Sequence, residues 1–340
     1  MKAVLATQFG DPTVLKVADL PDPVPGPGEI AIDVTHAAVG LIDVFLRQGL
    51  YQDRPGLPQP PFVPGLEVAG TVRALGDGVT GFAAGEHVVS MSGPGSGGYA
   101  AVHVGPAYLV ASTEGYDLDP ALVVSVVPNA AMAHIAFTRV LHLAEGESVL
   151  VHGALGGFPA AFPGIARQLG ATRVVGTVRA SKLAAAAATR LPYDQIVDSA
   201  DLPGALGDEK FDVVIDAVGG EVRTRSLDLM KPGGRLLACG NASGDWGHQI
   251  DSNQLWLRSI AVSGFSSGAY LPAHPQLVRP ALQAALKAAA AGLGETEVDV
   301  LPFSEAVTAH QRMESRDLDG RIVLTPGVSR YAGLTGSRRR

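Results

Sequence analysis

The spacing of apolar and polar residues changes once along this chain. Up to about residue 116 the apolar positions form short runs with β-type alternation, such as residues 29–39 (EIAIDVTHAAV) and 68–75 (VAGTVRAL). Clusters rich in glycine and proline separate these runs, as in residues 22–28 (DPVPGPG), and such clusters mark turns between strands. The first third of the chain is therefore predicted to form a twisted, barrel-like β domain.

The rest of the chain alternates strand-like and helix-like segments. An apolar helical stretch comes first, and six apolar strand candidates follow it, at residues 148–153, 173–178, 195–199, 212–218, 234–240 and 259–265. Alternation of this kind predicts a parallel, doubly wound sheet with helices on both faces. We expect one domain over residues 1–120, a second over 121–265, a return to the first over 266–327 and a disordered tail over 328–340.

Composition narrows the class of protein further. Hydrophobic residues make up 46% of the 340 residues and charged residues 17%, which excludes an intrinsically disordered chain. The net charge of -7, with residues 338–340 (RRR) as the one basic run, argues against a nucleic-acid partner. We find no secretory signal and no run of about 20 apolar residues that would span a membrane. We therefore expect a soluble cytoplasmic protein without nucleic-acid or membrane partners.

Seven segments, in order along the chain, carry a resemblance to a known family. They are residues 2–19, 47–52, 62–72 (FVPGLEVAGTV), 149–157 (VLVHGALGG), 212–220 (DVVIDAVGG), 233–244 (GGRLLACGNASG) and 309–326 (AHQRMESRDLDGRIVLTP). Together they resemble the medium-chain dehydrogenase/reductase superfamily, and most of all its zinc-free quinone oxidoreductases, the zeta-crystallin-like branch. The resemblance implies an α/β fold with a GroES-like β-barrel domain and a Rossmann domain, NADPH as cofactor, a small-molecule substrate in the cleft between the domains, and a homodimer.

A catalytic zinc ion is not expected. Zinc-dependent members of the superfamily have a histidine before the glutamate of the turn at residues 64–70, but here Leu66 precedes Glu67. Leucine cannot bind a metal, and Cys239 is the single cysteine, so a multi-cysteine zinc site cannot form. We expect no metal, with Glu67 as an acceptor for nearby backbone amides and Cys239 as a small core residue.

A glycine turn followed by a helix is predicted at residues 148–171. Gly153, Gly156 and Gly157 permit the tight turn and close backbone approach that a dinucleotide requires. Pro159 has no amide hydrogen, and Pro163 removes the hydrogen bond from residue 163 back to residue 159. The helix is therefore expected either to kink there or to begin later, which weakens the turn as a phosphate site.

At the phosphate end of the predicted cofactor site, some residues favour phosphate binding and one opposes it. Arg179, Ser181 and Lys182 follow the second Rossmann strand, where the resemblance places the 2′-phosphate of NADPH. Their charge and hydrogen-bonding groups favour NADPH over NAD. Asp198 stands at the end of the third strand, where a carboxylate would repel a phosphate.

The residues expected around the nicotinamide also include some that support cofactor binding and some that oppose it. The resemblance places Asn241 and Ser243 in the loop that closes the nicotinamide pocket, whereas Gly40 and Met132 stand where the family has an asparagine and a threonine. The sequence thus predicts a degenerate NADPH site, and it leaves open that no cofactor is bound.

Three residues are candidates for the chemistry. Tyr51, in a context similar to that of enoyl-thioester reductases, is a candidate proton donor to the substrate or a hydrogen-bond donor to its carbonyl, although it can equally be a lining residue. Asp43 is a candidate for orienting Tyr51 or a water molecule, with a buried structural role as the alternative. Asn241 would help to place the nicotinamide ring.

Two functions from different classes follow. The first is NADPH-dependent reduction of a quinone or an α,β-unsaturated carbonyl (enoyl) compound, with Tyr51 or solvent as the proton source. The second is a redox-inactive use of the same fold, as cofactor-independent cyclisation, dehydration or isomerisation of a natural-product intermediate in a shaped, dry cavity. The departures at Pro159, Gly40, Met132 and Asp198 are the reason for keeping the second function.

Overall fold

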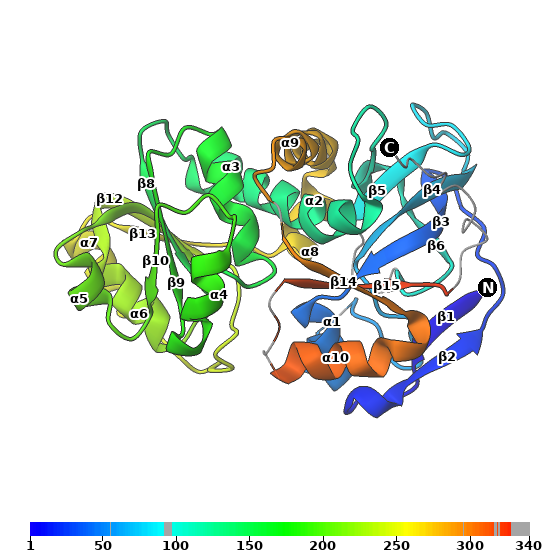
Figure 1. The fold of residues 1–340 in the computed structure, drawn as a ribbon, viewed down its shortest axis with the longest axis horizontal. Coiled ribbons are helices and arrows are strands. Elements are labelled where there is room, and N and C mark those ends of the chain that lie inside the picture. The colour runs from blue at the N-terminus through cyan, green and yellow to red at the C-terminus, as the bar shows by residue number, and fades with distance from the viewer. Residues whose placement is uncertain (55, 92–96, 295, 316–317, 319, 328–340) are drawn as a thin grey trace, which may run out of the picture. The chain divides into compact units, whose positions relative to one another are not determined.

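The chain forms two compact units, which are described separately (Figure 1). The computed structural model describes residues 1–54, 56–91, 97–294, 296–315, 318 and 320–327. The first unit holds Met1–Ser125 and the C-terminal segment from Glu297, and the second holds Val126–Thr296. Residues 266–296 group with the second unit, so the return to the first begins later than the sequence suggested. The expected tail over 328–340 lies outside the described residues.

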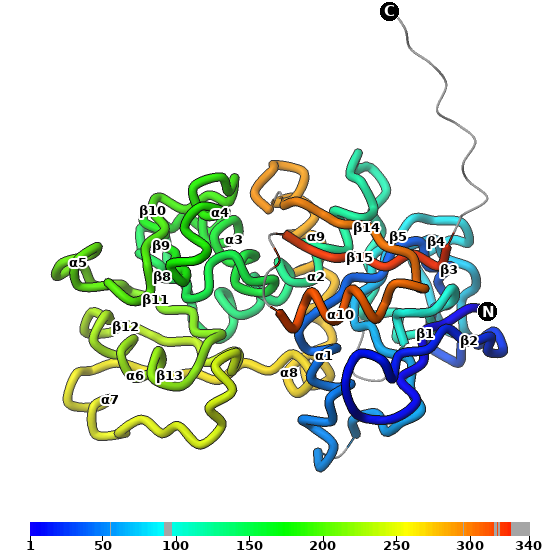
Figure 2. The backbone as a smooth tube through the Cα atoms, turned by 60° about the horizontal axis from the view of Figure 1, so that its bottom comes forward, coloured from blue at the N-terminus to red at the C-terminus, as the bar shows by residue number. Residues whose placement is uncertain are grey.

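The first unit is a β structure, as expected. Strand β3 lies centrally in a seven-stranded sheet with the order β14-β15-β3-β4-β5-β7, and β6 also pairs with β3. The strands are β3 (Glu29–Ala38), β4 (Glu67–Leu75), β5 (His87–Met91), β6 (Val102–Pro106), β7 (Val110–Ser112), β14 (Val298–Pro302) and β15 (Arg321–Thr325). A separate hairpin joins β1 (Lys2–Ala6) to β2 (Leu15–Asp19). The C-terminal strands β14 and β15 run side by side in both views (Figures 1 and 2).

Alternating apolar residues explain why these strands form the core of the first unit. Ile30, Ile32 and Val68 are fully buried, and Leu324 joins them from the far end of the chain. The helices of this unit are α1 (Leu41–Gln48) and α10 (Ala306–Ser315), with 3₁₀ turns η1 (Pro12–Val14), η2 (Ala107–Leu109) and η7 (Phe303–Glu305). Helix α1 begins directly after β3, which places its first turn at the end of the sheet.

The second unit contains a six-stranded sheet with the order β10-β9-β8-β11-β12-β13. All neighbouring strands are parallel, and the order reverses between β8 and β11, as in Rossmann folds. The strands are β8 (Ser148–His152), β9 (Arg173–Val178), β10 (Gln195–Asp198), β11 (Phe211–Asp216), β12 (Met230–Ala238) and β13 (Ala261–Gly264). Each matches one of the six strand candidates, so the predicted doubly wound sheet is confirmed.

Helices connect these strands and cover the sheet. They are α3 (Phe162–Gln168), α4 (Leu183–Ala188), α5 (Leu202–Leu206), α6 (Glu221–Asp228), α7 (Asn253–Leu257), α8 (Ser267–Ala273) and α9 (Val278–Ala290), with 3₁₀ turns η4 (Pro159–Ala161), η5 (Ala180–Lys182) and η6 (Pro275–Leu277). Helix α9 packs against α3, and the carbonyl of Leu293 lies so close to Gly164 that a Cβ there would be only 2.2 Å away. This packing explains why residues 266–296 group with the second unit.

We expected no apolar stretch long enough to span a membrane, and one long apolar helix corrects that expectation. Helix α2 (Pro120–Ile135) continues into the π-helical turn η3 (Ala136–Leu141), and this stretch of 22 residues is long and apolar enough to cross a membrane. Of the 18 residues that form its most apolar part, however, 72% are buried inside the protein. Burial of this extent is typical of a core helix.

Candidate functional site

The glycine turn after β8 has the tight geometry that its sequence predicts. Gly153 has a left-handed φ of 68°, a conformation that glycine adopts without strain. The amide of Gly156 donates to the carbonyl oxygen of Gly153 at 2.7 Å. Pro159 then opens a 3₁₀ turn, and the α-helix begins only at Phe162. The later helix start, one of the two outcomes expected from the prolines, is therefore confirmed.

Several amides of this turn are available to a ligand. Within the described chain, the backbone amides of Leu155, Gly157 and Phe158 take part in no hydrogen bond, whereas those of Gly156 and Ala160 are used inside the turn. Unpaired amides that follow the first strand of a Rossmann sheet are suited to a diphosphate. The turn therefore keeps three donors although Pro159 has removed a fourth.

The basic residues after β9 lie where the sequence suggested. Arg179 directly precedes the 3₁₀ turn η5, both Arg179 and Ser181 are exposed, and Lys182 is partly buried. Asp198 is opposite Val178 in the register of β10 and β9, so its carboxylate comes from the strand next to that of Arg179. One oxygen of Asp198 accepts from the amide of Ala200 at 3.0 Å, which satisfies part of its hydrogen-bonding capacity locally.

The loop after β12 holds a buried donor without a partner. Asn241 accepts from the Ser243 hydroxyl at 3.0 Å through Oδ1, but its buried Nδ2 has no partner among the described residues. Asn241 packs so closely on Gly219 that a Cβ at Gly219 would lie 2.3 Å from Asn241 Oδ1. An unpaired buried amide is costly, so the side chain is arranged for an acceptor supplied from outside the protein. The residues at both ends of the site thus fit a nicotinamide dinucleotide.

Asp216, which sequence reasoning missed, organises this part of the second unit. It is fully buried at the end of β11, and its Oδ1 accepts from the amides of Val218 (2.9 Å) and Gly219 (2.8 Å). Its Oδ2 accepts from Arg223 Nε at 2.7 Å. The available signal was the aspartate that ends a buried strand just before two glycines, a pattern typical of a carboxylate that caps a turn.

Cys239 is partly buried, so the expectation of a small core residue holds only in part. Its Sγ lies 3.5 Å from the carbonyl oxygen of Asp216, and burial raises the pKa of the thiol, so a thiolate is disfavoured. Across the part of the chain that the structure describes, no group of three or more His, Cys, Asp or Glu side chains is placed to hold a metal ion.

In the first unit, Asp43 is a structural centre and is not bonded to Tyr51. Its side chain is 1% exposed; Oδ2 accepts from the Gly40 amide (2.8 Å) and the Tyr99 hydroxyl (3.1 Å), and Oδ1 from the Gly65 amide (3.1 Å). Burial raises the pKa of Asp43 to about 6, while these hydrogen bonds act in the opposite direction. Asp43 therefore has the buried structural role that the sequence allowed as the alternative, and the tyrosine that donates to it is Tyr99.

Tyr51 lies just beyond the end of α1. Gly49, with a left-handed φ of 78°, ends the helix, and the Tyr51 ring then packs edge-on against Phe45 at 6.3 Å between centroids. The guanidinium of Arg54 lies 5.3 Å from the ring centroid. The side chain is half-buried, and burial raises its pKa above the ordinary value of a phenol.

Glu67 differs from the expectation. It was expected to accept backbone amides, but the amides of this region, from Gly40 and Gly65, go to Asp43 instead. The recorded partner of the Glu67 carboxylate is the guanidinium of Arg321, with 3.7 Å between Oε2 and Nη2. Arg321 was not predicted, because it is far from Glu67 in the sequence and becomes its neighbour only through the sheet. Burial raises the pKa of Glu67 to about 7 despite this cation.

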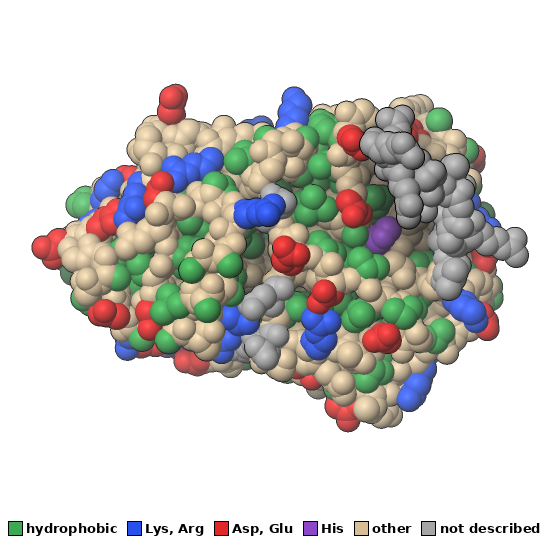
Figure 3. Space-filling model, viewed as in Figure 1, with side chains coloured by type: hydrophobic (Ala, Val, Ile, Leu, Met, Phe, Trp, Pro, Cys, Tyr) green, Lys and Arg blue, Asp and Glu red, His purple; other side chains and the backbone are tan. Residues whose placement is uncertain are grey.

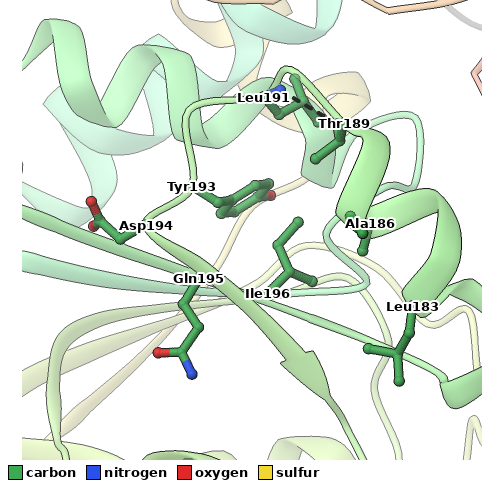
Figure 4. A pocket seen from close by; sticks show the side chains of 9 residues that line it. Leu183, Ala186, Thr189, Leu191, Tyr193, Asp194, Gln195 and Ile196 are labelled. Atoms are coloured by element: carbon green, nitrogen blue, oxygen red, sulfur yellow. Dashed lines mark hydrogen bonds between the residues drawn. The ribbon is translucent and has the colours of Figure 1, made fainter.

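A hollow of about 260 Å³ lies beside the edge strand β10 (Figure 4). Helix α4 supplies one wall, and the segment from Thr189 to Ile196 supplies the other, with the Tyr193 ring and the Ile196 side chain pointing toward each other. The Leu191 amide donates to Thr189 Oγ1 at 3.3 Å. None of the predicted cofactor residues lines this hollow, but its lining residue Tyr193 donates through its hydroxyl to the carbonyl oxygen of Ala154 in the glycine turn at 3.1 Å.

The fold and these residues define a two-domain α/β protein with a GroES-like unit and a dinucleotide-binding unit. Family models match both: an alcohol dehydrogenase GroES-like domain at residues 26–114 and a zinc-binding dehydrogenase domain at residues 169–324. The chain belongs to the medium-chain dehydrogenase/reductase superfamily, in its quinone oxidoreductase branch. Within that superfamily it is of the quinone oxidoreductase type.

Individual relatives cover nearly the whole chain. A human synaptic vesicle membrane protein VAT-1 homolog is 29% identical over 96% of this chain and 87% of its own length. A 2-haloacrylate reductase from Burkholderia sp is 30% identical over 89% of this chain and 92% of its own. A mycobacterial quinone oxidoreductase structure is 29% identical, covers 96% of this chain and 100% of its own, and has a TM-score of 0.82; a mycobacterial structure complexed with NADPH gives the same values.

Proposed function

We propose that this protein reduces a quinone or an α,β-unsaturated carbonyl compound with NADPH. The observation that carries the proposal is the set of unpaired donors at the carboxyl ends of the Rossmann strands: three amides after β8 and Asn241 Nδ2 after β12. A reductase and an NADPH complex among the similar proteins support it. The exposed Arg179 and Ser181 after β9, together with Lys182, favour the 2′-phosphorylated cofactor.

In this proposal each part of the chain has a definite task. When bound, NADPH supplies a hydride. The amides of Leu155, Gly157 and Phe158 would hold the diphosphate, and Asn241 Nδ2 would hold the nicotinamide end of the cofactor in position. Tyr51 is the candidate donor, of a hydrogen bond or a proton, to the substrate oxygen. No metal is assigned a task, because Leu66 replaces the zinc-binding histidine.

A binding titration tests the proposal. NADPH should quench tryptophan fluorescence saturably and bind more tightly than NADH, and Arg179→Ala should remove most of that preference. Glu221→Gln, at an exposed position on α6, serves as the control and should change neither affinity. Consumption of NADPH in the presence of quinones and enones then identifies the substrate class.

The redox-inactive function remains the second candidate, and Pro159 is the observation that favours it. The proline removes a donor from the turn and delays the α-helix to Phe162. Under this alternative the protein would bind no NADPH at millimolar concentration, and it would convert a substrate by cyclisation, dehydration or isomerisation without a nicotinamide. The titration above therefore separates the two candidates.

We further propose a cytoplasmic homodimer with a small-molecule substrate and no nucleic-acid or membrane partner. Strand β13 is an edge strand, paired in the described chain only with β12, and a symmetric partner would cover it. On the face shown in Figure 3, acidic and basic side chains are interspersed without a continuous basic surface. Light scattering after gel filtration should give twice the chain mass, and Val262→Pro should reduce it to the monomer.

A further inference from the structure

The pair formed by Glu67 and Arg321 stands at one end of the sheet of the first unit. Glu67 is the first residue of β4 and Arg321 the first residue of β15, and β3 runs between these two strands. The amide of Val39, just beyond β3, donates to the carbonyl of Ile322 at 2.9 Å, which holds the strand ends together. The sheet thus brings a carboxyl and a guanidinium from distant parts of the sequence to the same end of neighbouring strands.

Both side chains are buried but poorly paired. The side chain of Arg321 is 8% exposed and that of Glu67 14%. Among the described residues, neither side chain makes a hydrogen bond, and Arg321 Nε is buried without a partner. Hydrogen-bonded ion pairs have N···O distances of about 2.7–2.9 Å, so 3.7 Å leaves both groups able to bind something else. Of the guanidinium nitrogens, Nε is the one that is buried without a partner in the described chain, and an unsatisfied buried donor costs free energy, so this pair is not arranged for stability alone.

Asp43, Glu67, Tyr99 and Arg321 form one cluster of charged and titratable groups. The charges in this cluster favour a bound proton. Two carboxyls, Asp43 and Glu67, share one guanidinium, that of Arg321. The charge of Asp43 is stabilised by three hydrogen-bond donors, whereas that of Glu67 is stabilised by none. Tyr99 is the other titratable group of the cluster, and it donates to Asp43. A proton held by the cluster therefore resides on Glu67, and the pKa of about 7 for Glu67 against about 6 for Asp43 agrees with this order.

We propose that Glu67 is the acid that supplies the proton consumed in the reduction, with Arg321 stabilising the carboxylate that remains. This inference rests on the proposed reductase function. The substrate gains a hydride, with its two electrons, at one end of the conjugated system, and the O–H bond of Glu67 breaks to give a proton to the other end. The product is the neutral hydroquinone or, from an enone, the enol, which tautomerises to the saturated carbonyl compound, and water then returns a proton to Glu67.

Glu67 is better suited to this task than Tyr51. A general acid works best when its pKa lies near the operating pH. Glu67 meets that condition, whereas burial moves the pKa of Tyr51 further above the ordinary value of about 10 for a phenol. Tyr51 is then the residue that donates a hydrogen bond to the substrate oxygen, and Glu67 the one that loses a proton.

Steady-state kinetics from about pH 5 to about pH 9 test the proposal. The wild-type kcat should fall as the pH rises through 7, because less Glu67 is protonated. Glu67→Gln should lower kcat roughly tenfold or more at pH 6, with little change in KM, and should lose this pH dependence. Glu67→Asp should recover part of the lost kcat and part of its pH dependence. Tyr51→Phe should keep the pH dependence, and Glu221→Gln should match the wild type.

An infrared measurement without cofactor or substrate provides an independent readout. The wild type should show a protonated-acid carbonyl stretch that disappears as the pH rises through 7, and Glu67→Gln should lack this component while keeping the one that Asp43 gives near pH 6. A Glu67→Gln variant with the kcat and pH profile of the wild type overturns the proposal, and so does the absence of the band. If the wild type shows the band but consumes no NADPH with any quinone or enone, the proposed function fails, and the acid role with it, although Glu67 still holds a proton.

Discussion

Two sets of buried polar groups, one in each unit, differ in how completely they are paired; outside these sets, Asn241 Nδ2 is unpaired in the second unit and Asp43 is fully paired in the first. In the second unit, Asp216 accepts two amides and pairs with Arg223 at 2.7 Å. Both ring nitrogens of the buried His152 also have partners, Thr177 Oγ1 at 3.0 Å and Ser226 Oγ at 2.9 Å. These groups hold β8, β9, β11 and α6 in place, and they leave little capacity for binding a ligand.

The first unit has buried groups that are not paired in this way. Glu67 and Arg321 make no hydrogen bond among the described residues, and neither ring nitrogen of the fully buried His310 has a partner. A buried polar group with all its hydrogen bonds made stabilises the fold, whereas one without them costs free energy. The comparison teaches that satisfied clusters mark the framework of this protein and unsatisfied ones mark places where chemistry or a ligand can be expected.

The largest effect is expected from Asp216→Ala. Removing one partner of a buried ion pair leaves Arg223 and two amides without their acceptor, which should lower the free energy of unfolding by about 3–5 kcal/mol. Urea denaturation followed by circular dichroism measures the change. Glu67→Gln at neutral pH is the matched comparison and should not be destabilising. A similar loss for both variants would remove the distinction between the clusters.

The second prediction concerns the pH dependence of stability at Glu67. The folded state keeps its proton up to about pH 7, whereas the unfolded chain ionises near pH ~4.3. Between these values the unfolded state binds fewer protons, so the wild type loses stability as the pH rises. Glu67→Gln removes that loss. Its stability relative to the wild type should therefore increase by on the order of 3 kcal/mol from pH 4 to pH 8, and a flat difference would contradict the assignment.

Two histidine variants compare the clusters directly. His152→Phe should cost about 1–3 kcal/mol at pH 7, because the Thr177 hydroxyl loses its buried partner. His310→Phe should change stability by less than about 1 kcal/mol, because no hydrogen bond is lost and an aromatic ring can keep the edge contact with Tyr99.

The same variants should differ from the wild type in acid. Burial lowers the pKa of His152 to about 4 and that of His310 to about 3. As the pH falls below the ordinary histidine pKa of about 6.5, the unfolded chain binds protons that the folded chain does not, and the wild type loses stability. In a series of thermal melts at decreasing pH, each variant should lose stability less steeply than the wild type. An unchanged slope would show that the histidine is not buried in its neutral form.

The smallest effect is expected at the glycine turn. Pro159→Ala and Pro159→Gly both restore an amide next to the three that are already unpaired, and one added hydrogen bond of about 0.5–1.5 kcal/mol corresponds to roughly 2- to 12-fold tighter NADPH binding. Gly adds flexibility and Ala does not, so agreement between the two variants assigns the gain to the amide. Calorimetric titration gives the affinities, and unchanged values would remove Pro159 as a cause of weak binding.

The sequence predicted the elements of both units and, as one alternative, a buried structural role for Asp43, but not the hydrogen-bond partners of the polar centres. Runs such as residues 148–153 and 212–218 were recognised as buried strands, and the effect of Pro159 on the helix start followed from proline chemistry alone. In contrast, the backbone amides were assigned to Glu67, although they go to Asp43, and neither Asp216 nor Arg321 was selected. Periodicity reports which face of an element is buried, and it contains no information on which side chain meets which donor.

By itself, the sequence determined the two-domain α/β fold, the family and the missing zinc ligand, because apolar periodicity, turn residues and the identity of residue 66 are local properties of the chain. Only the tertiary structure decided which carboxyl is satisfied. Gly40, Gly65 and Tyr99 converge on Asp43, while Arg321 reaches Glu67 from the last strand. Hydrogen bonding depends on positions accurate to a fraction of an ångström, and residues far apart in sequence acquire such positions only when the sheet has formed.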